Sequence, residues 1–335
     1  MSLRLAITLL IFLSGTVCAQ NYPSRPIRVI VPFAAGGAAD TVGRAMGNRL
    51  GEILGQQLII ENRAGGMSAI GTDLVSKASP DGYTLLLAVS PPHSVFPFFI
   101  KNLPFDNIKD FTPIALIGTL PQAIVVNPSL PVRNLKELID YARKNPGKLA
   151  YGTAGIGTGQ HFGGLMLNKL AAIDLQHIGY KGGGQAINDV LGGQLPIGIL
   201  TLSNLMVHAR SGKLRLIAMI EAQRAKAAPD VPTVAEAGLP GFAIPDTWIG
   251  LMGPANLPPA IVNALNSATT KSLEHPDVRS RLDAAGFELR STTQQSFADS
   301  IAKGYSVFQR IVSDASIQPE RSERRAMHHC TLIFA

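Results

Sequence analysis

The sequence contains little cysteine, few aromatic residues and little charge. Of its 335 residues, 2 are cysteine, 6% are aromatic and 16% are charged. Cys18 lies in an apolar N-terminal stretch and Cys330 lies close to the C-terminus, so the sequence offers no disulfide framework. A hydrophobic core must therefore hold the fold, and a chain of this length can bury one, divided between two domains.

Catalytic and cofactor motifs are also missing. The sequence has no G-x-S-x-G, no H-E-x-x-H, no C-x-x-C and no G-x-x-x-x-G-K-[ST]. Gly157-x-Gly159-x-x-x-Gly163 is a weak match to a dinucleotide loop, because Asp174 comes before the next strand rather than at its end. His328-His329-Cys330 would need support from neighbouring groups to hold a metal. We therefore expect no catalytic residue, no metal and no cofactor.

Charge and apolar runs limit the partners. The net charge is +7, but the basic residues lack the clustering and the interleaved aromatic residues of a nucleic-acid surface. They indicate at most a preference for an anionic ligand or an anionic membrane surface. After the N-terminal stretch, no apolar run approaches the ~18 residues of a membrane-spanning helix. We expect a monomer that binds no nucleic acid.

Residues 1–19 have the features of a cleavable signal peptide. Arg4 is their only charge, an apolar run around Leu9–Leu13 is too short to span a bilayer, and small residues precede a cleavage site after Ala19. Thr16-Val17 fits a lipoprotein signal poorly, and an uncleaved anchor is the other alternative. The sequence thus predicts an exported protein.

The stretch from Arg28 to Arg49 predicts a strand, a glycine loop and a helix. Val29–Val31 is a short β-branched run, Pro32 ends it, and apolar residues recur at helical spacing after Gly36-Gly37. Such a loop points backbone N–H groups at an anion, although any strand-to-helix turn also needs glycines. Asp40, in the first helical turn, either stabilises the helix dipole or contacts the ligand.

Strands and helices alternate along the rest of the chain in two halves, which predicts parallel sheets in an α/β fold. A second glycine loop, Thr153–Gly159, follows a strand in the second half, and Asn134–Glu137 resembles a capping box. We expect Ser90–Ser94 to be a loop, Pro229–Pro245 to be a return linker and 259–313 to be mostly helical. The other expected strands are 58–60, 83–89, 114–117, 123–126, 149–152, 175–178, 197–200, 214–220 and 248–252.

Three side chains beside these loops are ambiguous. His161 either donates a hydrogen bond to an anion or caps its helix, and His93 is either a ligand contact or a plain loop residue. Lys181 would attract a carboxylate if it faced a cleft and is otherwise solvated. Because ligands bind beyond the carboxyl ends of strands in open α/β sheets, two such halves predict a cleft that closes on a small molecule.

Several segments resemble the Bug family of TctC-like substrate-binding proteins, in a resemblance that covers 22–318. The matching segments are YPSRPIRVIVPFAAGGAAD (22–40), ENRAGG (61–66), SPDGYTLLLA (79–88), LPFDNIKDFTPIALIG (103–118), YKGGGQAINDVLGGQ (180–194) and PDVPTVAEAGLPGF (229–242).

The resemblance implies a periplasmic type II binding-protein fold, with two α/β domains joined by a hinge and a ligand cleft between them. It places the signal peptide at 1–19, domain 1 at 20–122 and 245–318, domain 2 at 123–244 and an aberrant tail at 319–335. The implied function is a receptor that captures a small organic carboxylate and delivers it to the membrane subunits of a tripartite tricarboxylate transporter.

Family members hold a carboxylate chiefly through backbone amides of the first strand-to-helix loop and through ordered waters. Matching loops follow two other strands, and His93, His161 and Thr201 lie beside them. The candidate ligand-binding residues are Phe33, Ala34, Ala35, Gly36, Gly37, Asp40, Ser90, His93, Thr153, Ala154, Gly155, His161 and Thr201.

One departure from the family bears on the ligand. Many relatives read G-G-Q-V-D-L-M-F-D-N where this chain has GGQLPIGILT at Gly192–Thr201, so Leu200 or a neighbour replaces an acidic residue expected to face the cleft. The loss removes a partner for a ligand ammonium group. It disfavours an amino acid and favours an apolar or aromatic acid.

Two other functions stay open. One is a ligand-sensing protein without its own transporter, which the presence or absence of neighbouring transporter genes would decide. The other is a secreted α/β hydrolase or transferase that uses the glycine loops as an oxyanion or phosphate cradle. The missing nucleophile and base motifs argue against the enzyme.

Overall fold

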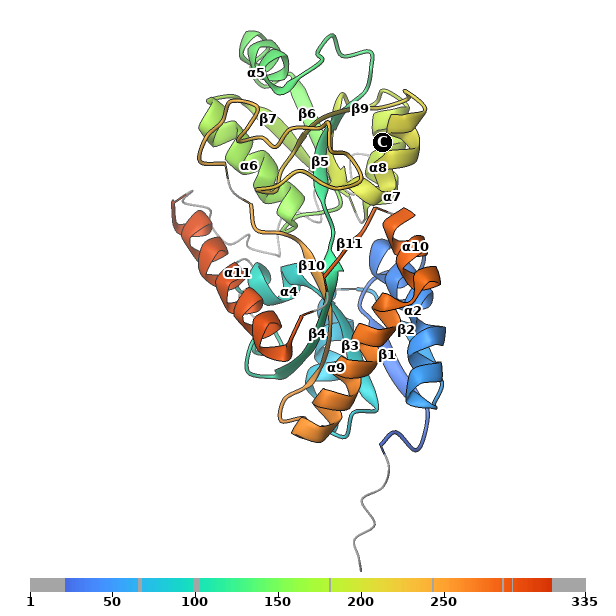
Figure 1. The fold of residues 1–335 in the computed structure, drawn as a ribbon. Helices are drawn as coiled ribbons and strands as arrows, with labels where there is room; N and C mark the ends of the chain where they lie inside the picture. Colours follow the sequence, from blue (N-terminus) through green and yellow to red (C-terminus); the bar gives the residue numbers. More distant parts are fainter. Residues whose placement is uncertain are drawn as a thin grey trace, which may run out of the picture.

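The computed structural model describes residues 22–65, 68–98, 103–180, 182–242, 244–284, 286–290 and 292–314 (Figure 1). The expected signal peptide (1–19) and tail (319–335) lie outside these residues, and so do Cys18, Lys181 and Cys330. The described chain forms two α/β domains, each built on its own sheet and here called domain 1 and domain 2.

Domain 1 has a six-stranded mixed sheet in the order β11-β4-β10-β3-β1-β2. β1 pairs in parallel with β2 and β3, as the sequence pattern predicts. The prediction of a parallel sheet is wrong for β4, β10 and β11, which pair antiparallel. The reason is that β10 enters from domain 2 rather than through a helical crossover. The strands are β1 (Ile27–Val31), β2 (Leu58–Asn62), β3 (Thr84–Val89), β4 (Phe111–Thr119), β10 (Trp248–Pro254) and β11 (Glu288–Leu289).

Helices cover both faces of this sheet, because successive strand residues point to opposite faces. Val29 and Leu87 share an apolar cluster with α2 and α9, whereas Ile30 and Leu86 share another with α3 and α11. The helices are α2 (Ala38–Leu54), α3 (Ala69–Ser76), α4 (Ser90–Ser94), the 3-10 helix η2 (Phe96–Phe98), α9 (Pro259–Glu274), α10 (Pro276–Ala284) and α11 (Gln294–Asp314).

The segment Ser90–Ser94, expected to be a loop, is the short helix α4. Pro91 and Pro92 lie in its first turn, where proline supplies a helical φ and where a missing N–H costs no intrahelical hydrogen bond. The expectation of a loop is therefore wrong, because two prolines next to each other start a helix here.

Domain 2 has a five-stranded sheet in the order β7-β6-β8-β5-β9. The prediction of a parallel sheet is wrong here for β5, which enters from domain 1 and pairs antiparallel with β8 and β9. α5 and α6 pack on one face of it and α7 and α8 on the other. The side chain of Asn134 accepts the N–H of Glu137 at 2.9 Å, which confirms the predicted cap of α5. The elements are β5 (Gln122–Val126), α5 (Leu135–Lys144), β6 (Leu149–Thr153), α6 (Gly159–Ala171), β7 (Leu175–Gly179), α7 (Gly183–Leu191), β8 (Ile197–Thr201), α8 (Leu202–Arg210) and β9 (Arg215–Met219).

The carboxyl ends of the parallel strands in each domain point toward the other domain. The chain passes from β4 in domain 1 to β5 in domain 2 between Thr119 and Gln122. β10 begins beside Thr119 and runs antiparallel to β3, so the end of β3 at Val89 lies at this crossing. In domain 2, Gln122 pairs with Thr201 at the end of β8. The loops after β1 and β3 therefore lie on the end of domain 1 that faces the loops after β6 and β8.

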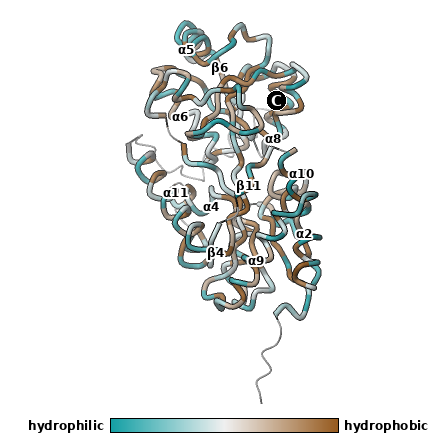
Figure 2. The backbone as a smooth tube through the Cα atoms, in the orientation of Figure 1, coloured by the Kyte–Doolittle hydropathy of each residue, from teal (hydrophilic) through white to brown (hydrophobic). Residues whose placement is uncertain are grey.

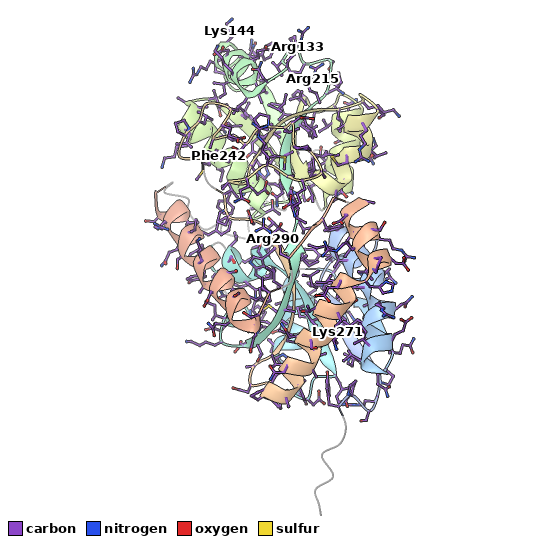
Figure 3. All side chains as sticks on the ribbon, in the orientation of Figure 1. Arg133, Lys144, Arg215, Phe242, Lys271 and Arg290 are labelled. Carbon is purple, nitrogen blue, oxygen red and sulfur yellow. The ribbon has the colours of Figure 1, made fainter. Side chains whose placement is uncertain are left out.

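Polar groups, some of them buried, line the crossing between the domains. Oε1 of Glu221 accepts the N–H of Gln122 at 2.9 Å, and burial raises the pKa of Glu221 well above its usual value. Arg290 lies at the waist of the molecule (Figure 3), 3.4 Å from Asp246 and 3.6 Å from Glu288. Polar side chains therefore lie where the chain crosses between the two domains.

Hydropathy follows this layered arrangement. Figure 2 shows hydrophobic residues along the central strands such as β4, and hydrophilic residues on outer helices such as α5. The largest side chains with almost no exposure include Tyr151 and Phe162 in domain 2 and Phe297 in domain 1. Within the described residues, no helix has both the length and the apolar character needed to cross a bilayer.

Candidate ligand-binding site

The loop after β1 exposes backbone at the end of domain 1. Ala34, Ala35 and Gly36 are exposed, whereas Phe33 and Gly37 are half-buried. Gly36 has a φ of 81°, in the left-handed region where glycine meets no steric penalty. The glycine that the sequence singles out is therefore needed for the turn.

The first turn of α2 is directed at this loop. Gly37 precedes the helix, and its carbonyl accepts the N–H of Thr41 at 3.0 Å. A helix leaves its first N–H groups, here those of Ala38, Ala39 and Asp40, without intrahelical partners. Glycine at the cap has no side chain that would satisfy them. This end of the 17-residue helix therefore suits an anion.

Asp40 holds the loop in shape. Its Oδ2 accepts the N–H of Gly36 at 2.9 Å and Nε of Arg44 at 2.9 Å. Arg44 also donates to Oδ1 of Asn62 at 3.1 Å, and Asn62 donates to the Phe33 carbonyl at 3.1 Å. Burial alone would raise the pKa of Asp40, but the hydrogen bonds from Arg44, Gly36 and Asn62 outweigh it and lower that pKa. Asp40 is therefore a carboxylate that positions the loop.

Ser90 and His93 lie in α4, and both are buried. The His93 ring packs edge-to-face on Phe111 with 4.9 Å between centroids, and its Nδ1 lies 3.1 Å from the carbonyl oxygen of Asn107. Burial lowers the pKa of His93 to about 4, so its ring is neutral at pH 7. The structure thus places this candidate inside domain 1, where it has the surroundings of a core residue.

The loop after β6 in domain 2 bonds to its own domain. The Ala154 N–H donates to Oε1 of Gln160 at 2.7 Å, and the Gly155 N–H donates to Oγ1 of Thr153 at 3.2 Å. The hydroxyl of Thr158 donates to the Gly155 carbonyl at 2.8 Å. Three of the polar groups in this loop are therefore already paired.

Two stacked histidines support the same loop. The rings of His161 and His177 lie 4.1 Å apart, centroid to centroid. Nδ1 of His161 accepts the N–H of Gly157 at 3.3 Å, which places the His161 ring proton on Nε2, and Nε2 of His177 lies 2.7 Å from Oγ1 of Thr153. Burial lowers the pKa of His161 to about 3, with help from His177, and lowers that of His177 to about 4. Both rings are neutral at pH 7.

The end of β8 corrects one expectation. Leu200 is fully buried in an apolar cluster with Ala123 and Leu202, so it does not face the other domain. Adjacent strand residues alternate between faces, and Leu200 takes the face that α7 and α8 cover. The next residue, Thr201, is half-buried, and its Oγ1 accepts Nε2 of Gln160 at 3.2 Å.

The two domains touch beside these loops. A Cβ added to Gly157 would lie 3.0 Å from Cε1 of Phe96, which belongs to η2 in domain 1. The sequence reasoning missed Arg44, Asn62, Gln160 and His177 as supports of the loops, because their partners are distant in sequence or lie around a turn. The described residues contain no group of three or more His, Cys, Asp or Glu side chains that could hold a metal ion.

Two α/β domains with loops facing each other across a crossing define the class of periplasmic binding proteins. A solved structure of the periplasmic binding protein BugD superposes with a TM-score of 0.81 at 31% identity, covering 89% of this chain and 100% of that one. The fold expected from the resemblance is thereby confirmed.

The chain belongs to the family described as "Tripartite tricarboxylate transporter family receptor", whose model matches residues 42–317. Protein BugT of Bordetella pertussis is 34% identical over 275 residues, which are 82% of this chain and 84% of BugT. The family expected from the sequence segments is confirmed.

Two similar solved structures carry a carboxylate. Rpa4515 of R. palustris with adipate has a TM-score of 0.83 at 28% identity, covering 89% of this chain and 100% of that one. MatC of Rhodopseudomonas palustris with bound malate has a TM-score of 0.79 at 31% identity, covering 87% and 100%. Both ligands are small organic acids.

Proposed function

We propose that this protein is a periplasmic receptor that captures a small organic carboxylate between its domains and delivers it to the membrane subunits of a tripartite tricarboxylate transporter. The observation that carries the proposal is the loop after β1, where exposed backbone and the uncapped first turn of α2 meet at a glycine. Membership of the receptor family and the acids held by two similar proteins support it.

In this proposal the ligand carboxylate binds at the first turn of α2. The residues that take part there are Phe33, Ala34, Ala35, Gly36 and Gly37. Asp40 acts through Gly36 and Arg44 rather than as a direct partner, because one carboxylate repels another. Direct contact with Asp40 would require a bridging water or a ligand ammonium group.

On the opposite domain, the proposal places Thr153, Ala154, Gly155, His161 and Thr201 around the rest of the ligand. Closure of the domains would bring both loops onto one molecule. The protein binds the acid and releases it unchanged, which fits a site built from backbone N–H groups and neutral rings.

A thermal-shift panel of mono-, di-, tri- and aromatic carboxylates tests the proposal. Ligand at 100 times its dissociation constant stabilises the native state by about 2.7 kcal/mol, so at least one acid should raise the melting temperature. Native mass spectrometry of the protein purified with its endogenous ligand should find a bound acid. No shift with any acid and no bound acid would sink the proposal.

Delivery to a transporter needs its own test. The receptor with bound acid should associate with membrane subunits encoded near it and lose the acid to vesicles that contain them. If no such genes neighbour the receptor gene and no membrane partner binds it, the protein would instead report the acid to a sensor.

A further inference from the structure

Three N–H groups of the loop after β6 are already paired within domain 2. The N–H groups of Ala154, Gly155 and Gly157 donate to side chains of the same domain. Oγ1 of Thr201, at the end of the neighbouring strand β8, accepts from Gln160. At these three N–H groups a ligand carboxylate would have to displace an existing acceptor, exchanging one hydrogen bond for another with little net gain.

The tip of this loop carries an apolar side chain. Ile156 is 40% exposed and lies between Gly155 and Gly157, which have φ values of 146° and 77°. Its Cγ1 lies 3.3 Å from the position of a Cβ added to Gly179, at the end of β7. The adjoining Gly157 backbone meets Phe96 of domain 1. Ile156 is therefore exposed on the end of domain 2 that faces domain 1.

Among the described residues, two histidine rings below the loop are the groups that could have given the tip a positive charge. The buried rings of His161 and His177 below the loop are neutral at pH 7. A second ligand carboxylate beside Ile156 would lose water hydrogen bonds and gain no cation from these rings. A ligand with an apolar far end would instead bury its carbon surface against the isoleucine.

We propose that Ile156 is a specificity-determining residue that selects acids with one carboxylate and an apolar or aromatic far end. This inference rests on the proposed function, since it takes the loop after β1 as the carboxylate site. The sequence comparison at Leu200 favours the same kind of acid, but Leu200 packs under α7 and α8, whereas Ile156 is exposed at the tip of its loop. The selectivity differs from what adipate or malate, each with two carboxylates, would need.

Titration calorimetry with hexanoate and adipate tests the proposal, because the two acids differ chiefly in the second carboxylate. The unaltered protein should bind hexanoate at least about tenfold more tightly than adipate. Ile156→Thr keeps the branch at Cβ and replaces the ethyl group by a hydroxyl, so hexanoate affinity should fall about fourfold while adipate affinity changes less than twofold. Ile156→Arg should reverse the preference.

Ile59→Thr is the matched control. Ile59 is 43% exposed on the edge strand β2 of domain 1 and carries the same side chain as Ile156. Its replacement should leave both affinities unchanged. Melting temperatures of all variants check that each one folds.

The outcomes separate the two proposals. Carboxylate binding with adipate equal to or tighter than hexanoate would overturn the role of Ile156 alone. So would a hexanoate-to-adipate ratio that Ile156→Thr and Ile156→Arg leave unchanged. If no acid of any class binds the unaltered protein, the proposed function fails and this inference fails with it.

Discussion

The loops after β1 and β6 have similar sequences and opposite hydrogen-bonding states. Both follow a buried strand, contain glycines at positive φ and lead into a helix. The first helix begins at Gly37, which has no side chain to cap it, whereas the second begins at Thr158, whose hydroxyl accepts the N–H of His161 at 3.2 Å. We call the loop after β1, whose helix has no side-chain cap, the open loop. We call the loop after β6, where the N–H groups of Ala154, Gly155 and Gly157 are paired, the closed loop.

The difference comes from the side chains that surround each loop. In domain 1, Asp40 accepts the N–H of Gly36 and is itself held by Arg44, and neither side chain caps the first turn of α2. In domain 2, Gln160 and His161 reach back from α6 and occupy the loop's own N–H groups. A glycine-rich loop in a sequence therefore indicates a sharp turn, and the neighbouring side chains decide whether it binds a ligand.

The largest change in ligand affinity is expected from a substitution at Gly36 in the open loop. Gly36→Val forces a β-branched residue to a φ of 81°, so the open loop should rebuild and carboxylate affinity should fall by at least about a hundredfold. Gly55→Val is the control, because Gly55 ends the same helix at a φ of 69° with open space around it. Equal affinities of both variants in calorimetry would remove the open loop from the site.

The next largest effect is expected in the pH dependence of stability, through the two histidines that support the closed loop. His161 and His177 have folded pKa values of about 3 and about 4, below the ~6.5 of an unfolded chain. The native state therefore binds fewer protons below pH 6.5, and stability present above that pH is lost as the pH falls toward 4. We expect these two rings to account for a loss of about 2 kcal/mol, allowing for partial solvent screening of His177. His93, with a pKa of about 4, adds to the loss in the same pH range.

Denaturant unfolding followed at several pH values measures this loss. His177→Gln keeps a hydrogen-bonding group near Thr153 and removes one titrating ring, so it should flatten the slope between pH 6.5 and 4. An unchanged slope would mean that other groups cause the acid sensitivity.

A smaller effect is expected from opening the closed loop. Gln160→Met keeps the length of the side chain but removes the acceptor of the Ala154 N–H and the donor to Thr201. Stability should fall by about 1 to 2 kcal/mol, and binding of adipate should tighten relative to hexanoate because an N–H becomes available. Gln176→Met, on an exposed position of β7, is the control. A lower melting temperature without any change in the ratio would show that Gln160 has a structural role only.

The local elements are largely predictable from the sequence, since they depend on near neighbours. The unit from Val29 to Gly55 follows from an apolar run, a glycine pair and helical spacing, and the structure confirms each part. Helix α8 and strand β11 escape such reasoning, because the helix directly follows strand β8 and the strand has only two residues. Their positions depend on neighbours that are distant in the chain.

The side-chain environment is where prediction from sequence fails. Leu200 belongs to a strand whose alternate residues face opposite layers, and its layer is settled only when α7 and α8 pack on the sheet. His93 carries no sequence signal that separates a ligand contact from a core ring. Its contacts with the carbonyl of Asn107 and the ring of Phe111 join residues far apart in the chain, so they appear only in the folded structure.

The sequence by itself determined the two α/β halves, the glycine loops at their strand ends and the family, because these follow from local periodicity and from short segments. The tertiary structure decided which loop is open. Asn62 and Arg44 come together below one loop, and Gln160, His161 and His177 come together around the other. Hydrogen bonds between residues far apart in the chain form only when the sheets are assembled, so the two similar loops become different only in the folded protein.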